Sequence, residues 1–341
     1  MKLAGGTRRW IQAVVMGALS FLGVMAGTVP ADVCMPGAVF FRPVEARAAA
    51  CEVEIVPLER AGCRLHLSRT IKAGTVPGKD ILLVHGVTYS SHEFDVDVED
   101  YSLTRFLAGQ GYAVWLLDIA GFGQSGSVRD GFLPDSDYAA LDIHAAAEAI
   151  QVRNGSRPID VLGWSWGTVT ASRFAAQHPE MVHRLVLYAP ILTGLGASPV
   201  AEAFHVNTWE HAAEDFRKNP DGSINTDIVE PKVAAAYFSN CWRYDGHGSP
   251  NGGRRDLMVS DRQRLIFPER LRMPVLVIEG SEDGYIDRRA LHQILPLLPK
   301  DSALVEIKGG AHAMLIEKPC YREFRRRLME FLNEPEAGPV L

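Results

Sequence analysis

Short runs of hydrophobic residues alternate with helix-like segments along most of this chain. Such runs are typical of strands that are buried on both faces of a parallel sheet. They cover residues 81–84, 113–117, 159–162, 185–187, 275–278 and 303–307. Between them, the spacing of apolar residues predicts helices over 138–152, 168–177, 288–295 and 321–332. This alternation predicts an α/β fold, with a doubly wound and mostly parallel sheet.

Two parts of the chain depart from this alternation. Residues 52–58 and 63–70 mix polar and apolar positions, which predicts antiparallel strands near an edge of the sheet. Residues 191–272 contain no strong buried strand, and aromatic residues are scattered there among polar ones. We interpret that interval as a helical cap inserted over the active site. The core is then formed by residues 51–190 and 273–335.

The first 48 residues read as a targeting segment rather than as part of the fold. Lys2, Arg8 and Arg9 precede an almost uncharged run over 11–29, which is the layout of a secretory signal. The paired arginines are similar to a twin-arginine signal. We expect residues 1–48 to be removed and the protein to be periplasmic or secreted. An uncleaved anchor is the alternative, because about 19 apolar residues can just span a bilayer.

Composition and charge exclude some partners. The chain has 341 residues, 47% of them hydrophobic, and a formal net charge of −6. That balance gives no attraction for nucleic acid, so none is expected as a partner, and membrane contact is expected only if the N-terminal segment is retained.

The cysteines leave two alternatives open. Four of the five follow residue 48, which allows one or two disulfides or, equally, buried free thiols. Without a CxxC spacing they predict no metal site.

The strongest chemical signal is the string Gly163-Trp164-Ser165-Trp166-Gly167. It lies between a predicted strand and a predicted helix, where a sharp turn presents the serine. The flanking elements crowd such a turn, so small residues are needed two positions before and after the serine. This context makes Ser165 a candidate nucleophile.

From this point the chain resembles the α/β-hydrolase superfamily, in particular its capped serine esterases, over residues 52–332. The resemblance implies a base after the last strand and an acid after the preceding parallel strand. His312 follows the strand at 303–307, and Asp283 follows the strand at 275–278. It therefore implies Ser165 as nucleophile, His312 as general base and Asp283 as the acid that orients it.

The same resemblance implies an oxyanion hole. His85-Gly86 follows a predicted strand like the family's oxyanion turn, which implies that the backbone N–H groups of Val87 and Trp166 bind the developing negative charge. His85 is the main rival to His312 as base, but the resemblance gives it a structural role. This turn contains one glycine, Gly86, whereas other branches of the superfamily have several glycines there. The resemblance therefore indicates a capped esterase whose oxyanion turn has a single glycine.

Three other carboxylates compete with Asp283 for the role of acid. Glu282 is its neighbour on the same turn and is expected to point elsewhere. Asp287 stands where the next helix starts, so we interpret it as an N-cap. Asp118 ends a strand that precedes Ser165, and we interpret its turn as architecture.

The predicted reaction is two-step acyl transfer from a small-molecule carboxylic ester to water, with no cofactor and no metal. Trp164 and Tyr89 are candidate substrate-binding residues for an apolar or aromatic group. Arginines of the insertion could meet a substrate carboxylate, although a solvated surface is the simpler interpretation. A carbon–carbon bond hydrolase acting on a diketone would use the same triad. A non-catalytic binding protein on the same fold is the third hypothesis.

Overall fold

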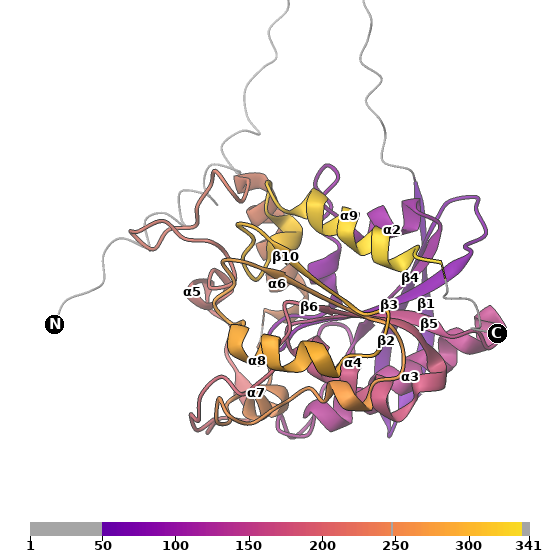
Figure 1. The fold of residues 1–341 in the computed structure, drawn as a ribbon, viewed down its shortest axis with the longest axis horizontal. Coiled ribbons are helices and arrows are strands. Elements are labelled where there is room, and N and C mark those ends of the chain that lie inside the picture. The colour runs from indigo at the N-terminus through magenta and orange to yellow at the C-terminus, as the bar shows by residue number, and fades with distance from the viewer. Residues whose placement is uncertain (1–49, 247, 336–341) are drawn as a thin grey trace, which may run out of the picture.

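A computed structural model describes residues 50–246 and 248–335 of the chain, and its centre is one eight-stranded sheet (Figure 1). The strand order is β1-β2-β4-β3-β5-β6-β9-β10. The strands are β1 (Cys51–Arg60), β2 (Cys63–Lys72), β3 (Lys79–Val84), β4 (Tyr112–Asp118), β5 (Ile159–Trp164), β6 (Val182–Tyr188), β9 (Val275–Gly280) and β10 (Ala303–Ile307). From β4 to β10 all neighbouring strands are parallel, whereas β2 is antiparallel to both β1 and β4.

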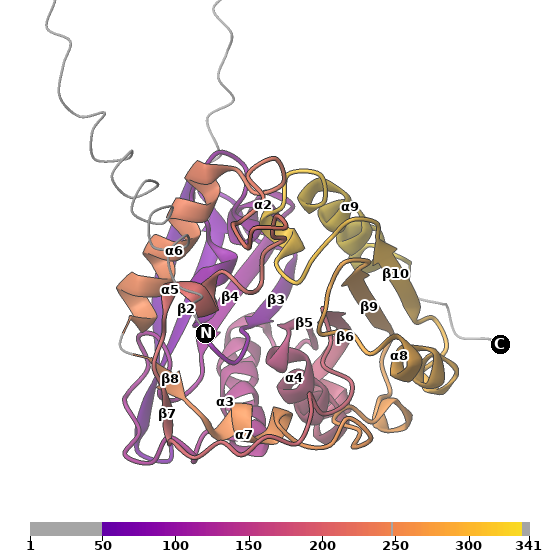
Figure 2. The ribbon, with the colours of Figure 1, turned by 90° about the vertical axis from the view of Figure 1, so that its left-hand side faces the viewer.

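Helices cover both faces of this sheet (Figures 1 and 2). On one face lie α3 (Ser136–Asn154), α4 (Trp166–Gln177) and α8 (Arg288–Ile294), and on the other lie α2 (Leu103–Gly109) and α9 (Tyr321–Leu332). Successive residues of a strand point to opposite faces. Leu82 and Val84 accordingly pack with the first set, and Ile81 and Leu83 with the second. This two-sided burial explains why the central strands are apolar throughout.

The predicted α/β class and its mostly parallel sheet are confirmed, and nearly every predicted element is present. Residues 303–307 differ in one respect, because β10 is an edge strand and is half-exposed rather than buried on both faces. Helix α2 was not predicted. It has only seven residues, and Ser102 caps its start by accepting a hydrogen bond from the backbone N–H of Arg105.

The residues between β6 and β9 form the insertion that interrupts the alternation. It contains β7 (Phe204–His205), α5 (Trp209–Ala212), α6 (Pro231–Asp245), β8 (Ser249–Pro250), α7 (Gly252–Leu257) and the 3-10 helix η3 (Pro268–Arg270).

The insertion is attached to loops at the carboxyl ends of the strands. Asp245, at the end of α6, accepts hydrogen bonds from the backbone N–H of Ser90 (3.0 Å) and of Gly123 (2.9 Å). The carbonyl of Asp215 accepts one from Ala313 N–H (3.2 Å). Ser90, Gly123 and Ala313 follow β3, β4 and β10, so the insertion lies at the edge of the sheet where ligands of such folds bind.

The predicted targeting segment at residues 1–48 lies outside the described residues. Within the part of the chain that the structure describes, no helix is long and apolar enough to cross a membrane. Of the cysteines, Cys63, Cys241 and Cys320 are free thiols, and the last two are buried. For these three, the thiol alternative holds rather than the disulfide.

Candidate active site

Ser165 occupies the single residue between the end of β5 and the start of α4, and its backbone is strained. Its φ angle is +57°, in a region that residues other than glycine rarely adopt. The two glycines of the motif make this turn possible. A Cβ atom on Gly163 would lie 2.2 Å from the carbonyl oxygen of Gly167, and one on Gly167 would lie 2.3 Å from that of Val84. Any side chain at either position would therefore force the strand and the helix apart.

The turn also exposes the serine selectively. Within residues 159–172, Ser165 is the one residue that is not buried. The tryptophans on either side point away from it: the Trp166 indole N–H donates to the Ser136 hydroxyl (2.9 Å), and the Trp164 indole N–H donates to the His312 carbonyl (3.1 Å). Ser165 is thus the part of this strand–turn–helix unit that solvent reaches.

Asp283 and His312, which are 29 residues apart in the chain, meet directly. Asp283 Oδ2 lies 2.8 Å from Nδ1 of His312, and both side chains are about 95% buried. The other oxygen of Asp283 accepts the backbone N–H of Tyr285 (2.9 Å), and the Tyr285 ring lies 4.7 Å from the imidazole. The carboxylate therefore holds the imidazole proton on Nδ1, which leaves Nε2 free to accept a proton.

The two competing carboxylates on this loop have other positions. Glu282 is exposed, and its Oε1 lies 3.5 Å from the hydroxyl of Ser281. Asp287 caps α8 by accepting the backbone N–H of Ala290 (3.0 Å), as the sequence predicted. Asp283 is thus the carboxylate of the three that contacts His312.

Tyr188 connects His312 to the serine turn. Its hydroxyl donates to the His312 carbonyl (2.7 Å), and its own carbonyl accepts the backbone N–H of Ser165 (3.0 Å). Trp164 stacks on the Tyr188 ring and donates to the same His312 carbonyl. Trp164 is 2% exposed and supports His312 from within the core. Its role in substrate binding stays a prediction.

The turn after β3 is fixed from two sides. The backbone N–H of Gly86 donates to the buried Glu93 carboxyl (3.0 Å), and His85 Nδ1 lies 2.8 Å from the Gly86 carbonyl oxygen. Because His85 Nε2 accepts the backbone N–H of Ile119 (3.1 Å), the proton of His85 lies on Nδ1 and is donated to Gly86. His85 is therefore a structural residue, with both nitrogens used and its ring fully buried.

This arrangement orients the predicted oxyanion donors. The peptide bond between Gly86 and Val87 is trans, so the Gly86 carbonyl and the Val87 N–H point in opposite directions. Because the Gly86 carbonyl oxygen accepts a hydrogen bond from His85 Nδ1, the Val87 N–H points away from His85. Gly86 lies against the serine, since a Cβ atom on it would be 3.5 Å from Ser165 Cβ. Trp166 is the first residue of α4, and its backbone N–H has no acceptor within the helix. Both donors thus belong to turns that adjoin Ser165.

The insertion adds a second carboxylate, Asp215, that the sequence did not reveal. Burial lowers the pKa of His312, but the charge and hydrogen bond of Asp283, together with the charge of Asp215, outweigh this and raise it above its ordinary value. Asp215 is half-buried and interacts electrostatically with His312, and desolvation raises the pKa of its carboxyl. No motif marks Asp215, because it lies in an irregular segment.

The insertion also contributes Arg254, which lies at the oxyanion turn. Its guanidinium donates to the Asn251 side-chain oxygen (2.7 Å) and to the Thr88 hydroxyl (2.9 Å), one residue after Val87. Burial lowers the pKa of Arg254 to about 10. Arg254 is half-buried, and within the described residues no carboxylate forms an ion pair with it, although the charge of Asp215 acts on it. Tyr89, the other candidate substrate-binding residue, is 2% exposed and packs edge-on against Tyr237 of α6.

Asp118 has the architectural surroundings that the sequence suggested. Its Oδ1 accepts the backbone N–H (3.0 Å) and the hydroxyl (2.5 Å) of Ser91, and its Oδ2 accepts the backbone N–H of Gln124 (2.8 Å). The carboxylate therefore ties the loop after β4 to the segment after β3.

Comparison with known proteins shows the family. A family model described as "Serine aminopeptidase, S33" matches residues 76–319, and the chain belongs to this family of α/β-hydrolases. It is therefore a hydrolase.

Two groups of curated relatives are similar along most of their length. The pimeloyl-[acyl-carrier protein] methyl ester esterase of Neisseria meningitidis serogroup A is 26% identical over 287 residues, which covers 77% of this chain and 80% of the relative. A putative non-heme chloroperoxidase of Synechocystis is 24% identical over 259 residues, covering 70% and 86%.

Solved structures share the fold at low identity. A bromoperoxidase from Bacillus anthracis superposes with a TM-score of 0.60 at 19% identity, covering 83% of this chain and 100% of its own. A putative lipase from Acinetobacter baumannii gives 0.59 at 16% identity, covering 84% and 93%. These likenesses concern the fold alone.

We predict that Asp283→Asn lowers ester turnover by about four orders of magnitude, because the amide leaves His312 in the wrong tautomer and uncompensated when it is protonated. Glu282→Gln and Asp287→Asn are the matched controls and should retain most of their turnover. Asp287→Asn should also lower the free energy of unfolding by up to about 1 kcal/mol, through a weaker cap. Near-normal turnover of Asp283→Asn would refute this assignment of the acid.

We also predict a pH effect of Asp215. A general base works in its neutral form, so kcat/KM rises as pH increases through the pKa of His312. That pKa is raised above 6.5, partly by Asp215, so Asp215→Asn should move the acid limb of the pH profile to lower pH. Glu214→Gln, at an exposed neighbour, should leave the limb in place. A shift to higher pH, or none, would show that Asp215 does not act on His312.

Proposed function

We propose that this protein hydrolyses a carboxylic ester by a Ser-His-Asp acyl-enzyme mechanism. The observations that carry the proposal are the 2.8 Å contact of Asp283 with His312 and the strained backbone of the half-buried Ser165. The esterase activity named for the Neisseria relative agrees with it.

The proposed mechanism has two steps, acylation of Ser165 and hydrolysis of the acyl-enzyme. His312 Nε2 takes the proton of the Ser165 hydroxyl as its oxygen attacks the ester carbonyl. The N–H groups of Val87 and Trp166 bind the oxyanion of the tetrahedral intermediate. As the intermediate collapses, His312 returns the proton to the departing alcohol, which leaves an acyl-Ser165 ester. Water then attacks this ester, with His312 again acting as base, and the carboxylic acid is released.

The remaining N–H groups of Arg254 favour a substrate that carries a polar or anionic oxygen near the reacting ester. Arginine has five N–H donors, and only two acceptors among the described side chains contact Arg254. A desolvated guanidinium gains most from a carboxylate or phosphate partner. We therefore extend the proposal to an ester whose acyl or alcohol part bears such a group. Of the alternatives raised by the sequence, this takes up the arginines of the insertion rather than the apolar pocket.

The activity is tested with a substrate panel. Carboxylic esters should be hydrolysed, and Ser165→Ala should lower kcat by at least about four orders of magnitude while circular dichroism remains unchanged. Ser260→Ala, at an exposed serine of the insertion, is the control. Preferential cleavage of a β-diketone would favour the carbon–carbon hydrolase, preferential cleavage of aminoacyl amides would favour a peptidase, and no turnover of any class would favour a binding protein.

Arg254 is tested with two esters of equal size, one with a terminal carboxylate and one with a neutral amide. Arg254→Gln should lower kcat/KM for the anionic ester by about ten- to a hundredfold, since a charge-assisted hydrogen bond is worth about 1.5–3 kcal/mol. The neutral ester should be little affected. Arg255→Gln, at the exposed neighbour on α7, should change neither. Equal losses for both esters would show that Arg254 only supports the oxyanion turn.

A further inference from the structure

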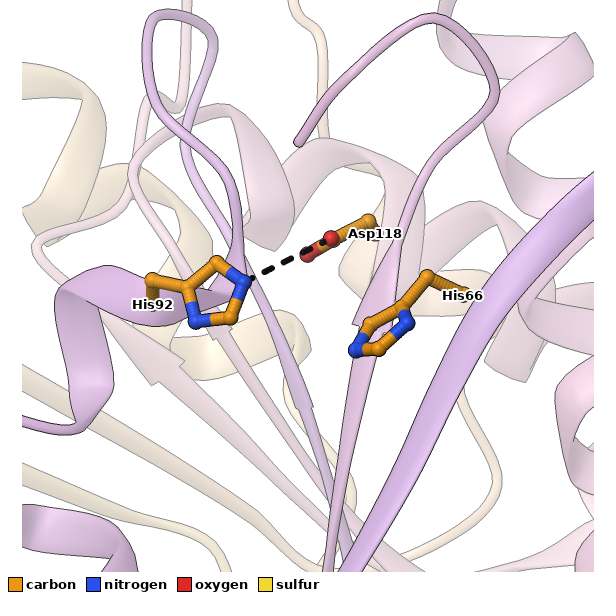
Figure 3. A group of neighbouring side chains, drawn as sticks. All are labelled: His66, His92 and Asp118. Atoms are coloured by element: carbon orange, nitrogen blue, oxygen red, sulfur yellow. Dashed lines mark ion pairs between the residues drawn. The ribbon is translucent and has the colours of Figure 1, made fainter. Parts of the chain in front are cut away.

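Two histidines and a carboxylate converge outside the site described above (Figure 3). His66 lies on β2, His92 on the 3-10 helix η1 (Ser91–Phe94), and Asp118 at the end of β4. One possible ligand atom from each residue lies within 4.8 Å of the other two. Three segments that are separate in the sequence thus bring two nitrogens and one oxygen together.

Hydrogen bonds fix the Asp118 carboxylate and leave one of its oxygens able to accept a further ligand. Two hydrogen bonds from Ser91 reach its Oδ1, whereas its Oδ2 accepts only the backbone N–H of Gln124 and lies 3.9 Å from His92 Nε2. A carboxylate has about four lone-pair sites, so Oδ2 retains capacity on the side of the histidines. Hydrogen bonds that fix a carboxylate in this way are typical of the surroundings of a metal ligand.

The histidines are also suited to act as ligands. His66 is 95% buried, yet its ring has no hydrogen-bond partner within the described part of the chain, and its centroid is 6.0 Å from that of His92. His92 Nε2 lies 3.1 Å from Oε1 of Gln124, so this amide oxygen is a possible fourth ligand.

We propose that His66, His92 and Asp118 form a binding site for a divalent transition-metal ion of the zinc type. Imidazole nitrogens and a carboxylate oxygen are the ligands that zinc prefers, and a water or Gln124 would complete a tetrahedron. The ligand atoms lie within 4.8 Å of one another, whereas bonds of about 2.1 Å to a tetrahedral ion require separations of roughly 3.3 Å, so side-chain rotations must accompany binding.

The position of this site indicates a structural role. His92 stacks on Tyr244 of α6 at 3.4 Å between ring centroids, and η1 directly follows the turn that bears Val87. An ion at His92 would therefore join β2, η1 and the end of β4 beneath the insertion. None of its ligands is among the residues proposed for acyl transfer, so metal removal should lower stability more than ester turnover.

The test uses the full chain without a polyhistidine tag, first stripped with a chelator. Calorimetric titration with Zn²⁺ should show one site per chain with a Kd below about 10 µM. His66→Gln and His92→Gln should each weaken binding at least about tenfold, as expected when one ligand is lost. His178→Gln removes a histidine from the stacked pair with His144 and should leave binding unchanged. Binding that survives in both His66→Gln and His92→Gln would overturn the proposal.

Two measurements on the unmodified chain make the test independent of how the variants fold. Co²⁺ should give the visible bands of a tetrahedral site and should be displaced by Zn²⁺. At a hundredfold excess over Kd, Zn²⁺ should raise Tm by about 5 °C. The absence of both effects, or of saturable binding below about 100 µM, would contradict the site whatever the outcome for ester hydrolysis.

Discussion

The buried side chain of Tyr188 is the connection on which the arrangement of the candidate site depends. Its carbonyl accepts the N–H of Ser165, and its hydroxyl donates to the His312 carbonyl and accepts the N–H of Leu315. It stands at the end of β6, between β5 and β9 in the sheet. One residue therefore connects the turn that bears Ser165 to the loop that bears His312, and its strand pairs with β9, which precedes Asp283. A parallel sheet brings strand ends to one edge, but only hydrogen bonds of this kind fix the relative orientation of the loops.

The sheet and the insertion contribute different residues to the candidate site. In the proposed mechanism, regular strand ends supply the serine, the acid and the base, where rigid backbone keeps them in place. The irregular insertion supplies Asp215 beside His312 and Arg254 beside Thr88, so it sets the proton affinity of the base and the polarity around the substrate. The core can thus remain constant while changes in the insertion alter pH dependence and selectivity. The candidate metal site lies at the boundary of these two parts.

Much of this organisation could be predicted from the sequence, for physical reasons. Strands buried on both faces must be apolar throughout, and the serine turn must have glycine at 163 and 167, so both leave a local pattern. Asp287 was identified as a cap because capping is also local. Asp215 and Glu93 were not singled out, and Arg254 was only one of several arginines considered, because their roles arise from contacts between segments distant in the chain. The burial of Trp164 could not be predicted, because its position beside Ser165 does not reveal the face of the sheet to which its ring points.

The central claim, that Ser165 is the nucleophile, is tested most directly by mapping a covalent adduct. The protein is treated with a fluorophosphonate, its intact mass is measured, and the modified peptide is identified by tandem mass spectrometry. The account predicts one adduct per chain, on the hydroxyl of Ser165, formed more slowly when ester substrate is present. An adduct on another residue, or turnover of esters by a protein that forms no adduct, would contradict it.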